Sequence, residues 1–180
     1  VTEQEVLSFS LYPGRELSGE EEAALREAAG RSGARARAAA MIGQRALSSR
    51  ELCRRLEQKG ERPEHAAEAV AWLEDIGALD DLAYARSVAR HYSAMGYGPA
   101  KLRDEFYRRG VPRELWDEAI EAEAGDSAAA IDRYIAAKLR GKRADEKTIR
   151  RIGDGLRRRG FRWEEIRPAL RRLQEENWEE

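Results

Sequence analysis

Paired carboxylates and a glycine-rich turn are the features of this chain that could most readily support chemistry. Asp80 and Asp81 are adjacent, and two such carboxylates could act together or hold a magnesium ion. They also precede an apolar periodic segment, and Asp is far more often a helix cap there. The segment Gly96-Tyr97-Gly98 resembles part of a phosphate loop, but it lacks the following Gly-Lys-Ser/Thr and a preceding strand. We therefore interpret the aspartates as caps and the glycines as a turn.

The other candidate groups are two histidines and one cysteine. His65 and His91 do not form a close metal-ligand pair, and Cys53 has no second cysteine beside it. We find no catalytic constellation in the sequence, and we expect neither a metal ion nor another cofactor. This lack of recognisable chemistry indicates a binding protein rather than an enzyme.

Basic residues are the third kind of functional group, and their distribution is uneven. Residues 1–30 hold seven Glu against two Arg, a net charge of −5. Residues 138–173 hold fourteen Lys or Arg against five Asp or Glu, a net charge of +9. Such a field could attract nucleic acid or an acidic protein surface, or it could be a solvated face. The candidate partner-binding residues are Lys101, Arg103, Arg108, Arg109, Arg140, Lys142, Arg143, Arg150, Arg151, Arg157 and Arg158.

An internal repeat of fifty residues organises the elements that must position these groups. Gly60, Gly110 and Gly160 are fifty residues apart, and each follows a basic residue. A fixed period of this size is typical of architectures in which one supersecondary unit is stacked several times. We expect the glycines to end helices and to carry no chemistry themselves. The eighth and fourth positions before each glycine are apolar in all three copies: Leu52 and Leu56, Leu102 and Phe106, Ile152 and Leu156.

Each repeat is predicted to form three helices, which gives an all-α fold of about nine helices in an elongated curved array. The first repeat covers residues 34–79, the second residues 80–125, and the third, which is basic, residues 126–180. Capping residues mark helix starts, as at Ser48, which has a glutamate three positions later. Proline in the first turn and glycine after the last turn mark other boundaries.

Residues 1–33 stand outside the repeat and are predicted to form a short appendage. Alternating apolar residues from Val6 to Leu11 suggest a strand that a proline-glycine pair ends. Ser18 has capping-box spacing and begins an acidic helix that runs to about Gly30. A separate alanine-rich helix, over residues 34 to about 44, then opens the first repeat.

Helical spacing separates core from surface in the third repeat. At about 100° per residue, the apolar positions before Gly160 share one side of a helix, and Arg151 and Arg158 point nearly opposite. Arg150 and Arg157 form a flanking stripe, so all four arginines should be available to a partner. Three tryptophans in third helices are expected to pack in the core rather than to stack on bases: Trp72, Trp116 and Trp163.

Composition sets further bounds. With 180 residues, 42% of them hydrophobic, the chain could form one domain or a short array of small units. Charged residues make up 37%, above the usual quarter, which favours helices with long solvated faces. No apolar stretch approaches the roughly 20 residues that span a bilayer. Because no basic-then-apolar signal segment opens the sequence, we expect a cytoplasmic location.

Several segments occur in an order and spacing that resemble a known family. Each is weak by itself, but the combination is specific. The segments are residues 46–52 (Ala-Leu-Ser-Ser-Arg-Glu-Leu), residues 73–81 (Leu-Glu-Asp-Ile-Gly-Ala-Leu-Asp-Asp), Gly98-Pro99, Lys101-Leu102 and Arg109-Gly110-Val111. On these segments the chain is similar to the RecX family of bacterial recombinase regulators, strongly over about residues 34–125 and more loosely over the third repeat.

The resemblance implies a small monomeric protein of DNA repair, recombination and the SOS response. Such a protein binds the RecA recombinase, lies in the groove of its filament on single-stranded DNA, and inhibits its ATPase, strand-exchange and co-protease activities. Two alternatives stay open. An autonomous DNA-binding protein with homeodomain-like units would use the basic third repeat, although the second repeat is far less basic. A purely structural helical scaffold would explain the repeat but would leave the charge asymmetry without a use.

Overall fold

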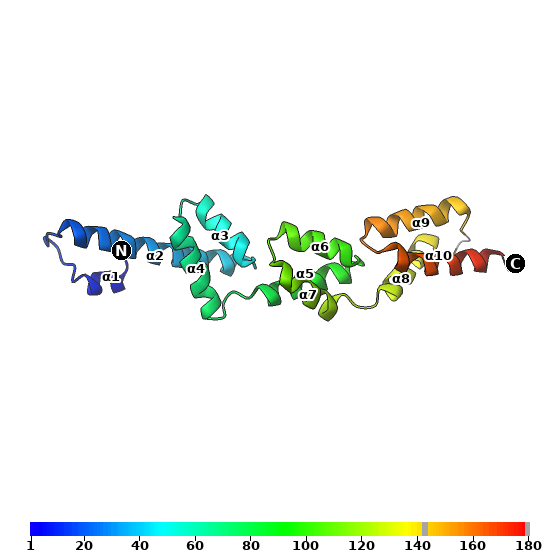
Figure 1. Ribbon diagram of the computed structural model, residues 1–180, viewed down its shortest axis with the longest axis horizontal. Coiled ribbons are helices and arrows are strands. Elements are labelled where there is room, and N and C mark those ends of the chain that lie inside the picture. The colour runs from blue at the N-terminus through cyan, green and yellow to red at the C-terminus, as the bar shows by residue number, and fades with distance from the viewer. Residues whose placement is uncertain (142–143, 179–180) are drawn as a thin grey trace. The chain divides into compact units, whose positions relative to one another are not determined.

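The computed structural model describes residues 1–141 and 144–178, and within these ranges every regular element is a helix (Figure 1). This confirms the all-α class and the array of three-helix units. Two compact units divide the chain, Val1–Asp80 and Asp81–Glu180. The boundaries that we assign to the three repeats stay a prediction. The helices are α1 (Glu3–Ser8), α2 (Gly19–Gln44), α3 (Ser49–Gln58), α4 (Pro63–Asp75), α5 (Asp81–Ala94), α6 (Pro99–Arg108), η1 (Arg113–Leu115), α7 (Trp116–Glu123), α8 (Ser127–Leu139), α9 (Glu146–Arg158) and α10 (Trp163–Trp178).

The strand expected over residues 6–11 is wrong, because most of this segment belongs to or directly follows helix α1. A capping box begins the helix: the Thr2 hydroxyl accepts from the Glu5 N–H, and the Glu5 carboxylate accepts from the Thr2 N–H at 2.7 Å. Glu5 is buried and also accepts a hydrogen bond from Ser32 of α2. Leu7 is 79% exposed, so the apolar alternation does not mark a buried face. Local capping therefore outweighs a six-residue pattern.

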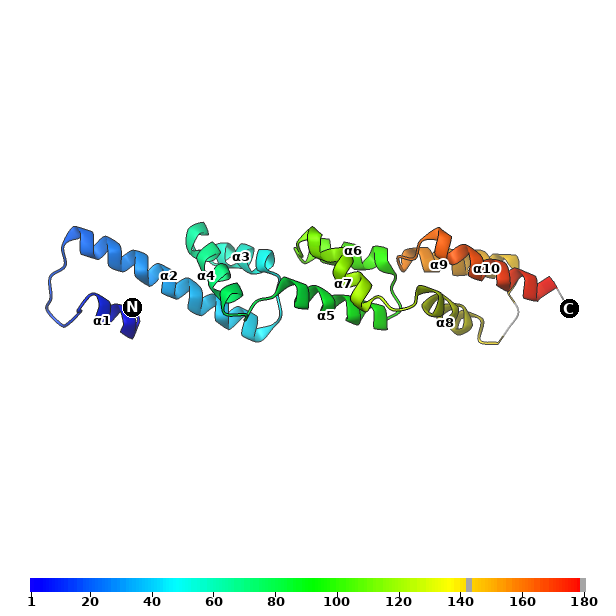
Figure 2. The ribbon, with the colours of Figure 1, turned by 60° about the horizontal axis from the view of Figure 1, so that its bottom comes forward.

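The acidic helix and the alanine-rich helix of the sequence form one continuous helix, α2, in Figures 1 and 2. The predicted stop at Gly30 is wrong, because this glycine lies inside α2, where a side chain would collide with the imidazole of His65. His65 of α4 is buried, and its Nε2 lies 2.7 Å from Glu27 Oε1. Arg62 donates to the other Glu27 oxygen at 2.6 Å. The glycine thus permits close approach of α2 and α4.

The three repeat glycines end α3, α6 and α9, as predicted. Gly60, Gly110 and Gly160 have φ angles of 92°, 69° and 89°, in the left-handed region that favours glycine. In each repeat, the glycine N–H donates to the carbonyl three residues earlier, and the next N–H donates to the carbonyl five residues earlier. This pair of bonds is the Schellman motif, which satisfies carbonyls at a helix end. The fifty-residue period therefore marks the same helix C-terminal motif in each repeat.

Each repeat has its own hydrophobic cluster. The apolar positions before the repeat glycines are buried in all three clusters, as the spacing predicts. A small residue faces them from each third helix, and these alanines are buried too: Ala69, Ala119 and Ala169. Because the repeated positions build the cores, α3, α6 and α9 each turn their other side outward, where the basic residues lie.

Backbone hydrogen bonds join the second and third repeats inside the second compact unit. The Gly98 N–H donates to the Arg159 carbonyl at 2.8 Å, and the Ala100 N–H donates to the Gly160 carbonyl at 3.1 Å. A side chain at Gly98 would collide with the Gly160 backbone. The segment from Gly96 to Gly98 is therefore a turn, as predicted, and it is where the third repeat docks.

The Arg159 side chain fixes the same junction. Its guanidinium donates to the carbonyl oxygens of Met95 at 2.9 Å and Gly96 at 3.2 Å. It also lies over the rings of Tyr97 and Tyr134, at 5.1 and 5.0 Å from their centroids. Although this arginine belongs to the basic repeat, its contacts are made within the protein.

Candidate partner-binding surface

The aspartates and the cysteine that could have supported chemistry lie at a helix start and beside a carboxylate. Asp81 is the first residue of α5 and Asp80 directly precedes it, as expected for a helix start. Cys53 Sγ lies 3.7 Å from a Glu57 carboxylate oxygen, and burial together with that charge raises the pKa of the thiol. Across residues 1–141 and 144–178, no group of three His, Cys, Asp or Glu side chains could hold a metal ion.

The basic residues predicted in the second repeat gather around one buried carboxylate. Glu105 of α6 is 3% exposed, and Lys101 Nζ lies 3.2 Å from its Oε1. Arg109 Nε lies 3.5 Å from its Oε2, and Arg108 also pairs with it. Burial raises the pKa of Glu105, but hydrogen bonds from Lys101 and Tyr92 and the charge of Arg108 bring it below its ordinary value. Three of the predicted partner-binding cations thus neutralise an internal charge.

Two members of this predicted set have further contacts. Arg109 donates to the hydroxyls of Tyr84 at 3.3 Å and Tyr92 at 3.5 Å, which holds its guanidinium against α5. Arg103 pairs with Asp117 of α7 at 2.7 Å. The second repeat therefore keeps most of its positive charge for its own packing, and we expect it to contribute less to a partner-binding surface.

We expect Glu105→Gln to lower the free energy of unfolding by about 1–3 kcal/mol at pH 7, because three cations lose their shared counter-charge. Folding lowers the pKa of Glu105, so its charge stabilises the protein above the unfolded-state value of 4.5. That contribution is lost as the pH falls through the lower, folded-state pKa. Urea unfolding should therefore show a smaller difference between variant and wild type at pH 3 than at pH 7.

The control for this experiment is Glu121→Gln, which removes an equal charge from an exposed position of α7. We expect it to change the free energy of unfolding by less than about 0.5 kcal/mol. A difference for Glu105→Gln that is equal at both pH values would contradict the role of its charge.

The arginines predicted on α9 lie on its exposed side. Arg150, Arg151, Arg157 and Arg158 are all exposed, whereas the apolar residues of the same helix are buried. Arg150 lies 4.0 Å from Glu146, and both side chains are largely in solvent. The other three form no ion pair with any residue that the structure describes. The sequence prediction of their accessibility is confirmed, and their binding to a partner stays a prediction.

Three more of the predicted residues follow helix α8 in the sequence: Arg140, Lys142 and Arg143. Arg140 follows α8 in the left-handed conformation, with a φ of 49°, and is exposed. Lys142 and Arg143 lie outside the described residues. The part of the predicted surface that can be described therefore consists of α9 and the end of α8.

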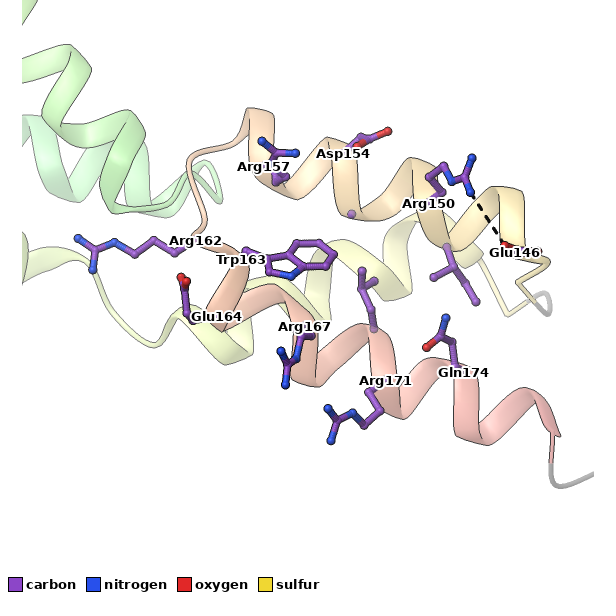
Figure 3. A pocket seen from close by; sticks show the side chains of 13 residues that line it. Glu146, Arg150, Asp154, Arg157, Arg162, Trp163, Glu164, Arg167, Arg171 and Gln174 are labelled. Atoms are coloured by element: carbon purple, nitrogen blue, oxygen red, sulfur yellow. Dashed lines mark ion pairs between the residues drawn. The ribbon is translucent and has the colours of Figure 1, made fainter.

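A groove of about 950 Å³ lies between α9 and α10 (Figure 3). Two arginines of the predicted stripe, Arg150 and Arg157, line it from α9. Its other side and its end include four residues that were not predicted to bind a partner: Arg162, Trp163, Arg167 and Arg171. The groove extends the exposed arginine surface of α9 onto α10.

The core position expected for Trp163 is wrong, because this side chain is 50% exposed. Trp163 is the first residue of α10 and occupies the place in its repeat that Pro63 and Arg113 occupy in theirs. Those two residues also begin helices and are exposed. Alignment of the three repeats therefore contains the signal that could have placed Trp163 at the surface. Trp72 and Trp116 are half-buried against their clusters, as expected.

The fold and this surface define a helical-repeat binding protein. Each of its three repeats has a core and a glycine stop, and exposed arginines that pair with no described residue gather on the third repeat: Arg151, Arg157 and Arg158. Repeat proteins of this kind bind other macromolecules through exposed faces. None of the helices within the described ranges is long and apolar enough to cross a membrane.

The chain belongs to the RecX family of regulatory proteins. Residues 80–120 match the second three-helix domain of RecX. Regulatory protein RecX of Xanthomonas citri is 34% identical over 137 residues, which cover 75% of this chain and 84% of that protein. Regulatory protein RecX of Trichlorobacter lovleyi is 37% identical over 125 residues, which cover 64% of this chain and 79% of that protein. The family resemblance of the sequence motifs is thereby confirmed.

Solved structures agree on the fold. A crystal structure of regulatory protein RecX has a TM-score of 0.76 and 21% sequence identity, covering 93% of this chain and 86% of that one. The crystal structure of RecX from Lactobacillus salivarius has a TM-score of 0.71 and 18% identity, covering 82% of this chain and 98% of that one. At these identities, the likeness concerns the fold.

Proposed function

We propose that this chain is a cytoplasmic regulator of the RecA recombinase and binds its filament on single-stranded DNA. By lying in the filament groove, it inhibits ATP hydrolysis, strand exchange and co-protease activity, and it has no catalytic activity of its own. The observation that carries the proposal is membership of the RecX family, at 34% identity over three quarters of the chain. RecA as the partner is what that membership implies.

The distribution of charge supports this function. A filament on DNA presents phosphates and acidic protein side chains, and both attract the arginines of α9 and α10. The cations of the second repeat are largely neutralised by Glu105 and Asp117, so the third repeat would supply most of the electrostatic attraction. Three units with separate cores could contact more than one filament subunit at once.

The test is a titration of this chain into RecA on single-stranded DNA. We expect DNA-dependent ATP hydrolysis and strand exchange to fall at amounts well below one chain per RecA subunit, because one bound chain affects several subunits. ATP hydrolysis followed by a coupled assay gives the inhibition curve. An unchanged rate at one chain per subunit would exclude the function.

The second candidate is an autonomous DNA-binding protein. It is favoured by the three exposed arginines of α9 that form no ion pair within the described part of the chain: Arg151, Arg157 and Arg158. Binding to DNA without RecA would then be as tight as binding to the filament. It would also weaken steeply with salt, with a logarithmic slope of roughly −0.7 per neutralised phosphate of a single strand. A much tighter interaction with the filament than with free DNA would decide for the regulator.

A further inference from the structure

The tryptophan of the groove lacks the contacts that hold the tryptophan of the second repeat. The Trp116 indole N–H donates to the Val111 carbonyl at 3.0 Å, and its ring packs on Phe106 at a centroid distance of 6.1 Å. The Trp163 indole donates to no residue that the structure describes, and half of its surface is in solvent. Its exposed ring is a flat apolar surface on which another planar group can stack.

Helix α9 has no side chain where it passes this indole. Gly153 is buried in the interior of α9, and a Cβ there would lie 3.0 Å from Leu170 and 3.8 Å from the Trp163 ring. Glycine weakens a helix interior relative to alanine, so this position costs α9 some stability. The floor of the groove is therefore free of a methyl group that would crowd Leu170 and cover part of the indole.

Arginines flank the indole on both sides. Figure 3 shows Arg157 on α9 and Arg167 on α10, with the Trp163 ring between the two helices. Neither of these arginines, nor Arg162, forms an ion pair with any residue in the described ranges. The lining as a whole holds five arginines and three carboxylates, so the groove has a positive excess.

We propose that the groove between α9 and α10 binds single-stranded DNA, with one base stacked on Trp163 and the neighbouring phosphates paired with the arginines beside it. An aromatic plane between guanidinium groups matches an unpaired base between phosphates. In a duplex, each base is already stacked on its neighbours and cannot offer its face. An acidic peptide would satisfy the arginines but would leave the indole uncovered. The choice of DNA as the strand rests on the proposed function, because that function places the chain on a single-stranded DNA filament.

The experiment measures binding of the full chain to a labelled deoxythymidine oligomer by fluorescence anisotropy, without RecA. Because stacking of one base on an aromatic ring stabilises the complex, Trp163→Ala should weaken the affinity for the oligomer by about 5–150-fold. Trp163→Phe keeps an aromatic ring and should lose less affinity. Arg157→Ala should weaken binding more than Arg151→Ala, which removes an equal charge from α9 outside the groove. A duplex with the same number of phosphates should bind more weakly than the single strand.

Several outcomes would overturn the proposal. The first is that Trp163→Ala and wild type bind the oligomer with equal affinity. The second is that wild type binds the duplex as tightly as the single strand. The third is that Arg157→Ala and Arg151→Ala lose equal affinity. A glutamate-rich peptide could also displace the oligomer. If that peptide binds Trp163→Ala and wild type with equal affinity, the groove would be assigned to an acidic protein. Circular dichroism checks that each variant is folded, and the conclusion can rest on Trp163→Phe and Arg157→Ala if Trp163→Ala is not.

The proposed function is measured in parallel and can fail separately. A wild-type chain that inhibits RecA but does not bind the oligomer overturns the groove assignment and leaves the function standing. A chain that binds the oligomer through Trp163 but does not affect RecA supports the groove assignment and overturns the function.

Discussion

Replacing Arg150, Arg151, Arg157 and Arg158 together by alanine should abolish inhibition of RecA without loss of helicity. All four side chains are exposed on α9, and none contributes to the buried cluster of the third repeat. Alanine is a good helix former, so α9 should persist. If each arginine contributes about 1 kcal/mol to binding, the four substitutions lower the affinity by about three orders of magnitude. ATP hydrolysis by RecA on single-stranded DNA gives the loss, and circular dichroism gives the helix content.

A matched control separates this surface from net charge. Four arginines outside the third repeat can be replaced by alanine to remove the same charge: Arg26, Arg54, Arg86 and Arg90. Because these residues already pair with carboxylates, we expect this variant to inhibit RecA nearly as well as wild type. Full inhibition of RecA by the α9 variant would show that these arginines do not take part in binding. An equal loss of inhibition in both variants would show that only the total charge of the protein matters.

Gly160→Ala should lower the free energy of unfolding by about 2–5 kcal/mol. Its φ of 89° is unfavourable for an L residue, which costs about 1–2 kcal/mol. A Cβ at this position would also collide with the backbone nitrogen of Lys101, so the junction between the second and third repeats would have to shift. Urea unfolding followed by circular dichroism measures the effect.

Gly60→Ala is the control, because Gly60 has nearly the same φ, 92°, at the same place in the first repeat. Nothing lies within 4 Å of a Cβ there, so only the conformational cost of about 1–2 kcal/mol should remain. The difference between the two variants isolates the contact between repeats. Equal destabilisation would mean that the close approach of Gly160 and Lys101 contributes nothing.

Features set by near neighbours in the chain could be predicted from the sequence. The stops at Gly60, Gly110 and Gly160 depend on bonds to residues three to five positions earlier, and the apolar spacing before them defines the buried side of each helix. The strand predicted over residues 6–11 is wrong, although it also rests on a local pattern. The capping box of Thr2 is an equally local signal, and it favours a helix. Two local signals competed there, and the capping bonds prevailed.

Features set by distant contacts could not be predicted in this way. Glycine is a common residue at helix ends, so Gly30 was predicted to end a helix. It instead lies inside α2 and allows close packing against His65, thirty-five residues later. Arg159 has the sequence context of its repeat equivalents, but its partners are the carbonyls of Met95 and Gly96. Such contacts arise only once the repeats are packed.

Two of the missed features did leave a signal in the sequence. Lys101, Arg108 and Arg109 stand four before, three after and four after Glu105, the spacings that bring side chains together on a helix. Their mutual neutralisation was therefore foreseeable. The exposure of Trp163 follows in the same way from its alignment with the helix starts of the other repeats.

Binding to an assembled RecA filament tests the central claim most directly. Single-stranded DNA is fixed to a biosensor, with or without RecA assembled on it, and the dissociation constant of this chain is measured on both surfaces at one salt concentration. We predict at least about tenfold tighter binding to the filament than to free DNA, a difference of about 1.4 kcal/mol. Binding to the filament that is equal to or weaker than binding to free DNA would contradict a role as a RecA regulator.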